Sequence, residues 1–187
     1  MNMKYIWDQM YTESHRTNEL LWGEAHENFL DRVLYFLRKS NLSKAVILDS
    51  GCGEGRNLIY MCKQQFSVHG IDFSKVAVKT ANRWIKDESL VDRASVILGD
   101  ITKIPYRSKS FDVVIDIYTL EFISEKVLYI KEIMDVLKPK GFFFLKVHKP
   151  PVPHSVRLID LKQLLEGKFN ILYVNPSFDS YCMYCQN

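Results

Sequence analysis

Short apolar runs alternate along this chain with longer segments in which apolar residues recur every three or four positions. The runs predict strands and the longer segments predict helices. Because the runs are continuous rather than alternating, the strands are expected to be covered on both faces, as in a parallel sheet. Strands separated by helices predict an α/β fold. The five runs are residues 45–49, 66–72, 94–100, 110–118 and 141–147.

The segments between and after these runs complete the expected order of elements. A helix is expected to begin at Ser74, which is a favourable N-cap residue. Another helix is expected to begin at Ser124 and to end where Pro139 and Gly141 interrupt the pattern. Beyond residue 148 the pattern predicts an irregular proline loop followed by two closing strands. Further helices are expected at 25–39, 55–65 and 160–168, and the closing strands at 170–174 and 180–186.

A bare backbone follows the first strand, where Gly51, Gly53 and Gly55 alternate with other residues. Glycines allow strained dihedrals and let a ligand lie on the backbone, and the next helix offers free N–H groups to an anion. The dinucleotide fingerprint would place its third glycine where Arg56 stands, and the lysine of a phosphate-binding loop is absent. One tight turn would not need three glycines, so the sequence favours a ligand loop without a phosphate signature.

Two acids end later strands of the predicted sheet. Asp72 follows the glycines by about twenty residues, where a carboxylate can accept both hydroxyls of a ribose. Asp100 ends the third strand, where it can accept from an adenine amine. The order of loop, ribose acid and adenine acid describes a nucleoside that carries a short zwitterionic tail.

With these features the sequence resembles class I S-adenosylmethionine-dependent methyltransferases. The motif GCGEGRN and the pair Trp7 and Tyr11 are similar to small tellurite-resistance and thiopurine-type enzymes and to the methyltransferase domain 11 and 25 families. The resemblance implies an α/β, Rossmann-like three-layer sandwich with a seven-stranded, mostly parallel sheet whose last strand is antiparallel. The matching segments are LDSGCGEGR (48–56), GIDFS (70–74), GDITKIPY (99–106), SFDVVIDIYTLEFI (110–123) and LKPKGFFFLKV (137–147).

The resemblance also implies an organisation and a set of cofactor residues. One domain would span 1–187, with an N-terminal lid and helix (1–40), a cofactor-binding core (45–147) and an acceptor-side end (148–187). S-adenosylmethionine would be the cofactor and S-adenosylhomocysteine its product. The residues expected to bind it are Asp49, Gly51, Gly53 and Arg56 in the loop, Asp72 and Phe73 at ribose and adenine, Asp100 and Ile101 at adenine, and Asp116 near the methionine amino group.

The methyl acceptor is expected over the ends of the fourth and fifth strands. Candidate catalytic residues there are Tyr118, Glu121 and His148, although simple packing is the favoured interpretation of Tyr118. Phe122 stands where related sequences often carry histidine, which leaves Glu121 as the retained candidate. Tyr11, Trp22 and His154 are candidates for a lid or for acceptor contact, with core anchoring a competing role for the tryptophan.

Composition indicates the broad class of protein and its expected location. The hydrophobic share of 47%, the charged share of 25% and a net charge of +3 are ordinary for a soluble protein. No apolar segment reaches the length of a signal peptide or membrane span, so a cytoplasmic location is expected. The four cysteines form no disulfide framework, and Cys182 and Cys185 lack a second pair, so no metal site is expected.

The leading interpretation is methyl transfer to a small molecule by in-line displacement. RNA or protein methylation and a non-catalytic cofactor-binding subunit are the alternatives. The weak charge and the absence of a proline-rich acceptor motif at DIYT (116–119) make nucleic acid the less favoured substrate. The sequence leaves open whether oxygen, nitrogen, sulfur or a metalloid receives the methyl group. An exposed sheet edge would allow a homodimer or a partner subunit.

Overall fold

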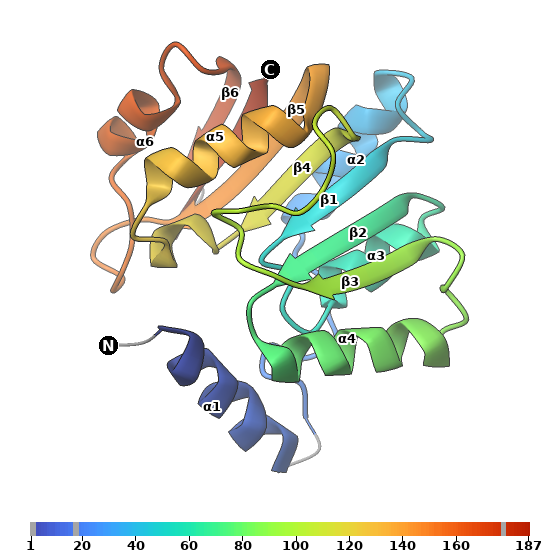
Figure 1. The fold of residues 1–187 in the computed structure, drawn as a ribbon. Coiled ribbons are helices and arrows are strands. Elements are labelled where there is room, and N and C mark those ends of the chain that lie inside the picture. Colours follow the sequence, from blue (N-terminus) through green and yellow to red (C-terminus); the bar gives the residue numbers. More distant parts are fainter. Residues whose placement is uncertain (1–2, 17–18, 177–178) are drawn as a thin grey trace. The chain divides into compact units, whose positions relative to one another are not determined.

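The chain folds into two compact units, Met1–Asp100 and Ile101–Asn187. A computed structural model describes residues 3–16, 19–176 and 179–187 (Figure 1). Among these residues, no helix is both long enough and apolar enough to cross a membrane.

The first unit is a parallel three-stranded sheet with helices packed on it. Strand β2 lies between β1 and β3 and is parallel to both. Helix α4 packs against β2 and β3, α3 contacts both α2 and α4, and α1 packs against α4 (Figure 1). The elements are α1 (Met3–Arg16), α2 (Phe29–Lys39), β1 (Val46–Ser50), α3 (Arg56–Lys63), β2 (Ser67–Asp72), α4 (Lys75–Asp87) and β3 (Ala94–Leu98).

Local sequence explains how these elements meet closely. Ser74 is extended at the start of α4 and its hydroxyl accepts from the Ala77 N–H at 3.2 Å, so the predicted cap is confirmed. A Cβ on Gly55 would lie 3.1 Å from the Cβ of Ala81, which indicates why glycine precedes α3. These contacts bring the start of α3 against α4.

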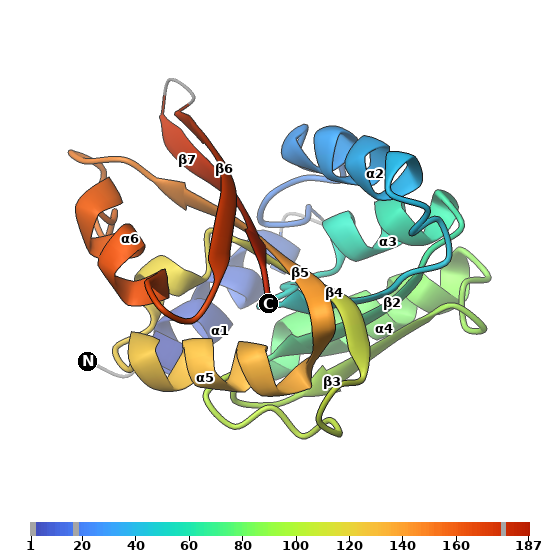
Figure 2. The same ribbon diagram turned by 90° about the horizontal axis from the view of Figure 1, so that it is seen from above.

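The second unit contains four strands. Strands β4 and β5 are parallel, and β7 is antiparallel to both β5 and β6. Helix α5 packs against β5 and contacts α6 (Figure 2). The elements are β4 (Phe111–Ile117), the 3-10 helix η1 (Leu120–Phe122), α5 (Lys126–Val136), β5 (Leu137–His148), α6 (Leu158–Leu165), β6 (Asn170–Pro176) and β7 (Ser180–Gln186).

The strand order of the sheet is β3-β2-β1-β4-β5-β7-β6, with six strands running the same way and β7 opposed. This Rossmann-like fold confirms the predicted class and the antiparallel last strand. The core follows the predicted runs: Ile47, Leu48, Val113, Phe143 and Phe144 are fully buried.

Three local expectations were wrong. Residues 25–28 lie outside the second helix, which begins at Phe29. Helix α5 begins at Lys126, so Ser124 is not its N-cap. Pro139 does not separate a helix from a strand: it lies inside β5, which starts at Leu137 and reaches Gly141 through an irregularity in its pairing with β4.

Candidate active site

The glycine loop leaves β1 with a backbone that ordinary residues rarely adopt. Gly51, Gly53 and Gly55 have φ angles of 76°, 54° and 89°. The amides of Gly51 and Cys52 donate to the carbonyl of Ile71 in β2, at 2.9 and 3.2 Å. The loop is therefore folded onto the carboxyl end of β2, the end at which sheets of this class bind ligands.

Asp72, the last residue of β2, is hydrogen-bonded to this loop. One carboxylate oxygen accepts from the Gly53 N–H at 2.9 Å, and the other accepts from the Ser74 N–H at 2.8 Å. Burial raises the pKa of the Asp72 carboxyl, and hydrogen bonds from the backbones of Ser74, Gly53 and Phe73 oppose that rise. The structure thus brings together two predicted cofactor residues, Gly53 and Asp72.

A side chain from α1 covers the loop. A Cβ built on Gly53 would lie only 2.8 Å from the hydroxyl oxygen of Tyr11. Tyr11 is buried, and its pKa is raised by desolvation and then by the nearby Asp72 and Glu54 carboxylates. A side chain at position 53 would collide with the Tyr11 hydroxyl, which indicates why glycine is needed there. We call this loop, residues 51–55, the glycine cradle.

The residues before α2 form an N-terminal strap, which we define as residues 3–16 and 19–28. The Glu54 carboxylate pairs with His15 and accepts from the Leu21 N–H at 2.8 Å. Arg56 donates to the carbonyls of Trp22 and Ala25, both at 3.0 Å. The loop that was predicted to bind the cofactor therefore also fastens the strap.

Two more contacts complete this attachment. The side-chain oxygen of Asn57 accepts from the Glu27 N–H at 3.0 Å, and the Ser74 hydroxyl bonds to Asp8. The predicted lid residue Trp22 is 52% exposed, and its ring lies 6.2 Å from that of Trp7. The strap thus has the position expected of a lid over the loop, while its function as one stays a prediction.

Arg56, predicted to bind the cofactor, contacts the strap in the structure, and its contact with a cofactor stays a prediction. Its guanidinium bonds to the two strap carbonyls and, at 3.3 Å, to the Glu27 carboxylate. The contacts in the structure are those of a strap anchor. The other predicted residues of this unit are Asp49, which is buried in β1, Phe73, which is half-buried, and Asp100, which is exposed. Their contacts with a cofactor stay predictions.

In the second unit, Asp116 organises the turn after β4. One of its oxygens accepts from the amides of Thr119 and Leu120 at 2.9 and 3.2 Å, and the other accepts from the Tyr129 hydroxyl at 2.8 Å. The side chain is fully buried, which raises the pKa of its carboxyl to about 7. These bonds make Asp116 a support of η1, and its contact with the methionine amino group stays a prediction.

The three candidate catalytic residues are brought together. Glu121 accepts from the His148 backbone N–H at 3.0 Å and lies 2.7 Å from its ring nitrogen Nδ1. The Tyr118 ring stacks on the imidazole at 4.0 Å between centroids. Nearby, the ring of the predicted acceptor residue His154 lies 5.2 Å from that of Phe122. Ile101, predicted at adenine, is half-buried at the start of this unit.

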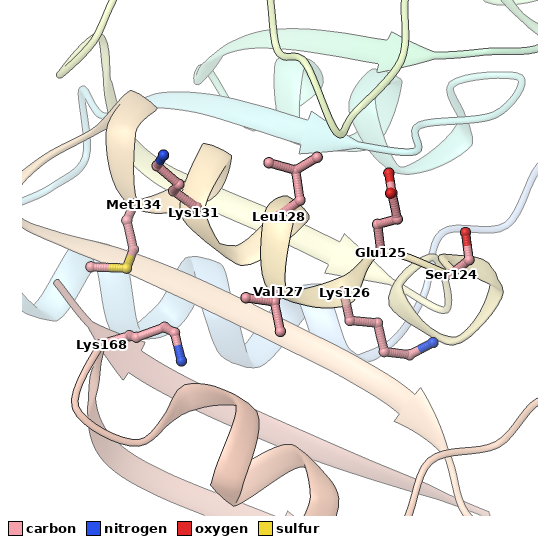
Figure 3. Close-up of a pocket in the computed structure, with 8 residues that line it drawn as sticks. All are labelled: Ser124, Glu125, Lys126, Val127, Leu128, Lys131, Met134 and Lys168. Carbon is pink, nitrogen blue, oxygen red and sulfur yellow. The ribbon is translucent and has the colours of Figure 1, made fainter.

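A separate groove runs along α5 in the second unit (Figure 3). It has a volume of about 620 Å³. Its walls come mainly from α5, with Lys168 from the segment after α6. None of the predicted catalytic residues lines it. The lining residues are Ser124, Glu125, Lys126, Val127, Leu128, Lys131, Met134 and Lys168.

All four cysteines are buried and unlinked. Burial raises the pKa values of the Cys62 and Cys185 thiols to about 12. Within the described part of the chain, no three His, Cys, Asp or Glu residues cluster in a way that could hold a metal ion.

Comparison with known proteins gives the class to which these features belong. A family model described as a methyltransferase domain matches residues 41–171. Norajmaline N-methyltransferase of Rauvolfia serpentina is 33% identical over 50% of this chain and 32% of that protein. Human EEF1A lysine methyltransferase 2 is 29% identical over 73% of this chain and 61% of that protein. The chain thus spans between about a third and three fifths of these relatives.

A solved structure extends the likeness to the whole fold. Burkholderia thailandensis 1,6-didemethyltoxoflavin-N1-methyltransferase, with bound S-adenosylhomocysteine, superposes with a TM-score of 0.72 at 18% identity. The match covers 100% of this chain and 90% of that one. The chain belongs to the class I S-adenosylmethionine-dependent methyltransferase family, as the sequence motifs predicted.

Proposed function

We propose that the protein transfers a methyl group from S-adenosylmethionine to a small-molecule acceptor. The observation that carries the cofactor half of this proposal is the 2.9 Å hydrogen bond between the Gly53 amide and the Asp72 carboxylate. It joins the bare loop to an acid placed for a ribose, at the end of the sheet where such ligands bind. Membership of the family supplies the reaction class.

Each part of the first unit has a task in this proposal. The glycine cradle takes the methionine end of the cofactor, Asp72 the ribose, and Phe73 and Asp100 the adenine. The sulfonium supplies an already activated methyl group. The protein then needs chiefly to align the acceptor and exclude water, which is proximity catalysis. The strap, held over the loop by Glu54 and Arg56, suits the exclusion of water.

A small-molecule acceptor is supported by the 33% identity to norajmaline N-methyltransferase. Methylation of a protein lysine is the second candidate, because the lysine methyltransferase matches over a longer part of the chain, 73%. RNA methylation and a non-catalytic binding subunit are alternatives without a supporting contact. A cytoplasmic location and a homodimer or partner subunit remain expectations.

The cofactor half is tested by calorimetric titration with S-adenosylmethionine and S-adenosylhomocysteine. We expect micromolar dissociation constants for both, a binding free energy of about −8 kcal/mol. Asp72→Ala should weaken both by at least about tenfold, since it removes a charged hydrogen-bond acceptor worth ~1.5–3 kcal/mol. Asp92→Ala, at an exposed acid of the same unit, is the matched control. A folded wild-type protein that binds neither compound would refute the proposal.

The acceptor half is tested with S-adenosylmethionine that carries a labelled methyl group. The protein is incubated in parallel with a panel of small phenols, amines and thiols, with lysine-containing protein extracts, and with RNA. Label in the small-molecule fraction supports the proposal. Label confined to protein would favour the lysine candidate, and cofactor binding without any transfer would favour a binding subunit.

A further inference from the structure

The contacts between Glu121 and His148 fix one histidine ring in a defined orientation. Both oxygens of Glu121 point to the same residue, one to its backbone N–H at 3.0 Å and one to ring nitrogen Nδ1 at 2.7 Å. The Glu121 side chain is fully buried, whereas the imidazole is 30% exposed. A buried carboxylate therefore holds a ring whose other edge can be reached from solvent.

This orientation sets the tautomer. A carboxylate accepts hydrogen bonds, so the short contact requires a proton on Nδ1. In the neutral ring the remaining nitrogen, Nε2, then carries a lone pair. No hydrogen bond engages Nε2 within the described parts of the chain. A carboxylate behind a histidine is the arrangement by which a general base is oriented and its cationic form stabilised.

The cluster formed by Tyr118, Glu121 and His148 also contains a strained backbone position and has a charged neighbour. Tyr118, which stacks on His148, has a φ of 63°, a conformation that is unusual for a bulky residue. Such strain of about 1–3 kcal/mol concentrates at functional sites. The Lys146 ammonium lies 4.8 Å from the centre of the Tyr118 ring. Lys126 and Asp116 also interact electrostatically with Glu121.

From this geometry we infer that Nε2 of His148 is a general base for methyl transfer, that Glu121 is its positioning residue, and that the acceptor is a phenolic hydroxyl. This inference rests on the proposed function. A base is needed only when the acceptor arrives protonated, as a phenol does near neutral pH. Aromatic rings at Tyr118, His148 and Phe122 suit a stacked phenol, and the Lys146 ammonium favours the developing phenolate.

The step balances without a further reactant. The phenolic oxygen forms a bond to the methyl carbon while the bond from that carbon to sulfur breaks. Sulfur keeps the electron pair and becomes a neutral thioether. The hydroxyl proton passes to Nε2 of His148, which becomes an imidazolium held by the Glu121 carboxylate.

The first experiment reads the tautomer and does not depend on turnover. Nitrogen-15 NMR of the full chain should show the His148 ring protonated on Nδ1 and unprotonated on Nε2 at a pH where the ring is neutral. Glu121→Gln should shift the ring toward a mixture of tautomers. A ring protonated on Nε2 in the wild-type protein would overturn the assignment of the base.

The second experiment compares two phenols at about pH 8.5, where 4-methylphenol keeps its proton because phenols ionise near pH ~10. The other probe, 4-nitrophenol, is already ionised under these conditions. We expect His148→Asn to lower kcat/KM for 4-methylphenol by about 10²–10⁴-fold and for 4-nitrophenol by less than about tenfold. Glu121→Gln should act in the same direction with a smaller loss. His69→Asn, at a histidine bonded to Ser95, is the matched control.

Equal losses for the two phenols would show a structural role and overturn the inference. If the wild-type protein binds the cofactor but methylates neither phenol, the acceptor class is wrong. If calorimetry finds no cofactor binding at all, the proposed function fails and takes this inference with it. Calorimetry on His148→Asn, which should bind the cofactor as the wild type does, keeps the outcomes separate.

Discussion

Replacing Gly53 with alanine tests whether the cradle and the strap are packed as the structure shows. The substitution adds one methyl group to a residue with a φ of 54°. The left-handed conformation alone costs a residue with a Cβ about 1–2 kcal/mol. The new carbon would also stand 2.8 Å from the hydroxyl oxygen of Tyr11, so one of the two must move. Overpacking of that kind costs a further ~1–3 kcal/mol.

Gly23→Ala separates the two contributions, because Gly23 has a φ of 67° and open space where its Cβ would lie. We expect Gly23→Ala to lower the free energy of unfolding by about 1–2 kcal/mol, and Gly53→Ala to lower it by about 2–5 kcal/mol. Tyr11→Phe removes the opposing oxygen. In the Gly53→Ala background, Tyr11→Phe should therefore lower the free energy of unfolding by less than it does in the wild-type protein, or should raise it.

Urea unfolding of the four proteins and the double variant measures these differences from the midpoints at constant slope. Cofactor titration of the same variants measures the effect of each substitution on cofactor binding. Gly53→Ala should weaken S-adenosylhomocysteine binding by at least about tenfold, or ~1.4 kcal/mol, whereas Gly23→Ala should not. Equal destabilisation by Gly53→Ala and Gly23→Ala, with additive effects in the double variant, would refute the close packing of Tyr11 on the loop.

Three further predictions concern the pH dependence, the strap and the thiols. Because burial raises the Asp116 pKa from 3.8 to about 7, the folded state keeps a proton that the unfolded state loses. The free energy of unfolding should thus fall between about pH 4 and pH 7; Asp116→Asn should flatten that fall in urea titrations, and an unchanged profile would contradict the assignment. Arg56→Ala should speed tryptic cleavage within the strap by about tenfold, the effect of ~1.4 kcal/mol less protection, with Arg38→Ala, which loses a bond to Gln64 and a contact with the Phe66 ring but none with the strap, as control. The four buried thiols should react with a disulfide reagent at an appreciable rate only in urea, and fast labelling of the native protein would show that they are accessible.

The central strands were predictable because most of their residues are buried. Residues such as Val113, Ile115 and Phe144 are fully buried, and they form continuous apolar runs that no other element of this length explains. The glycine loop was predictable for a different reason: positive φ angles require glycine, so the backbone conformation is visible in the sequence.

Helix α1 was not recognised as a separate helix, although a lid was expected there. Met3, Ile6, Trp7, Met10 and Tyr11 recur at helical spacing there, although Tyr11 is the only residue of its described length that is buried. The helix also has polar partners, such as the bond between Ser74 and Asp8. The hydrophobic pattern of a sequence does not show which polar side chains will bond to each other.

Ser124 and Pro139 failed as boundary signals for related reasons. A capping residue stabilises a helix end only where the backbone turns there, and α5 begins two residues later, after Glu125. Pro139 lies at the irregular part of β5, where the pairing with β4 shifts and a missing N–H does not break the ladder. In both cases the tertiary context decided between conformations that the local sequence allowed.

Arg56 and Asp116 have partners in the structure that their positions in the motifs do not show. Arg56 bonds to the carbonyls of Trp22 and Ala25, which are distant in sequence. Asp116 bonds to the Tyr129 hydroxyl as well as to the nearby amides of Thr119 and Leu120. A charged or buried polar group must find a partner when it folds, and it takes one that packing brings within reach. Glu54 illustrates the same point, since it lies between two glycines and no spacing in the sequence marks it as an anchor. In the structure it accepts the Leu21 amide and pairs with His15. The glycines therefore define where a ligand can lie, while the residues between them determine which segment of the chain closes over it.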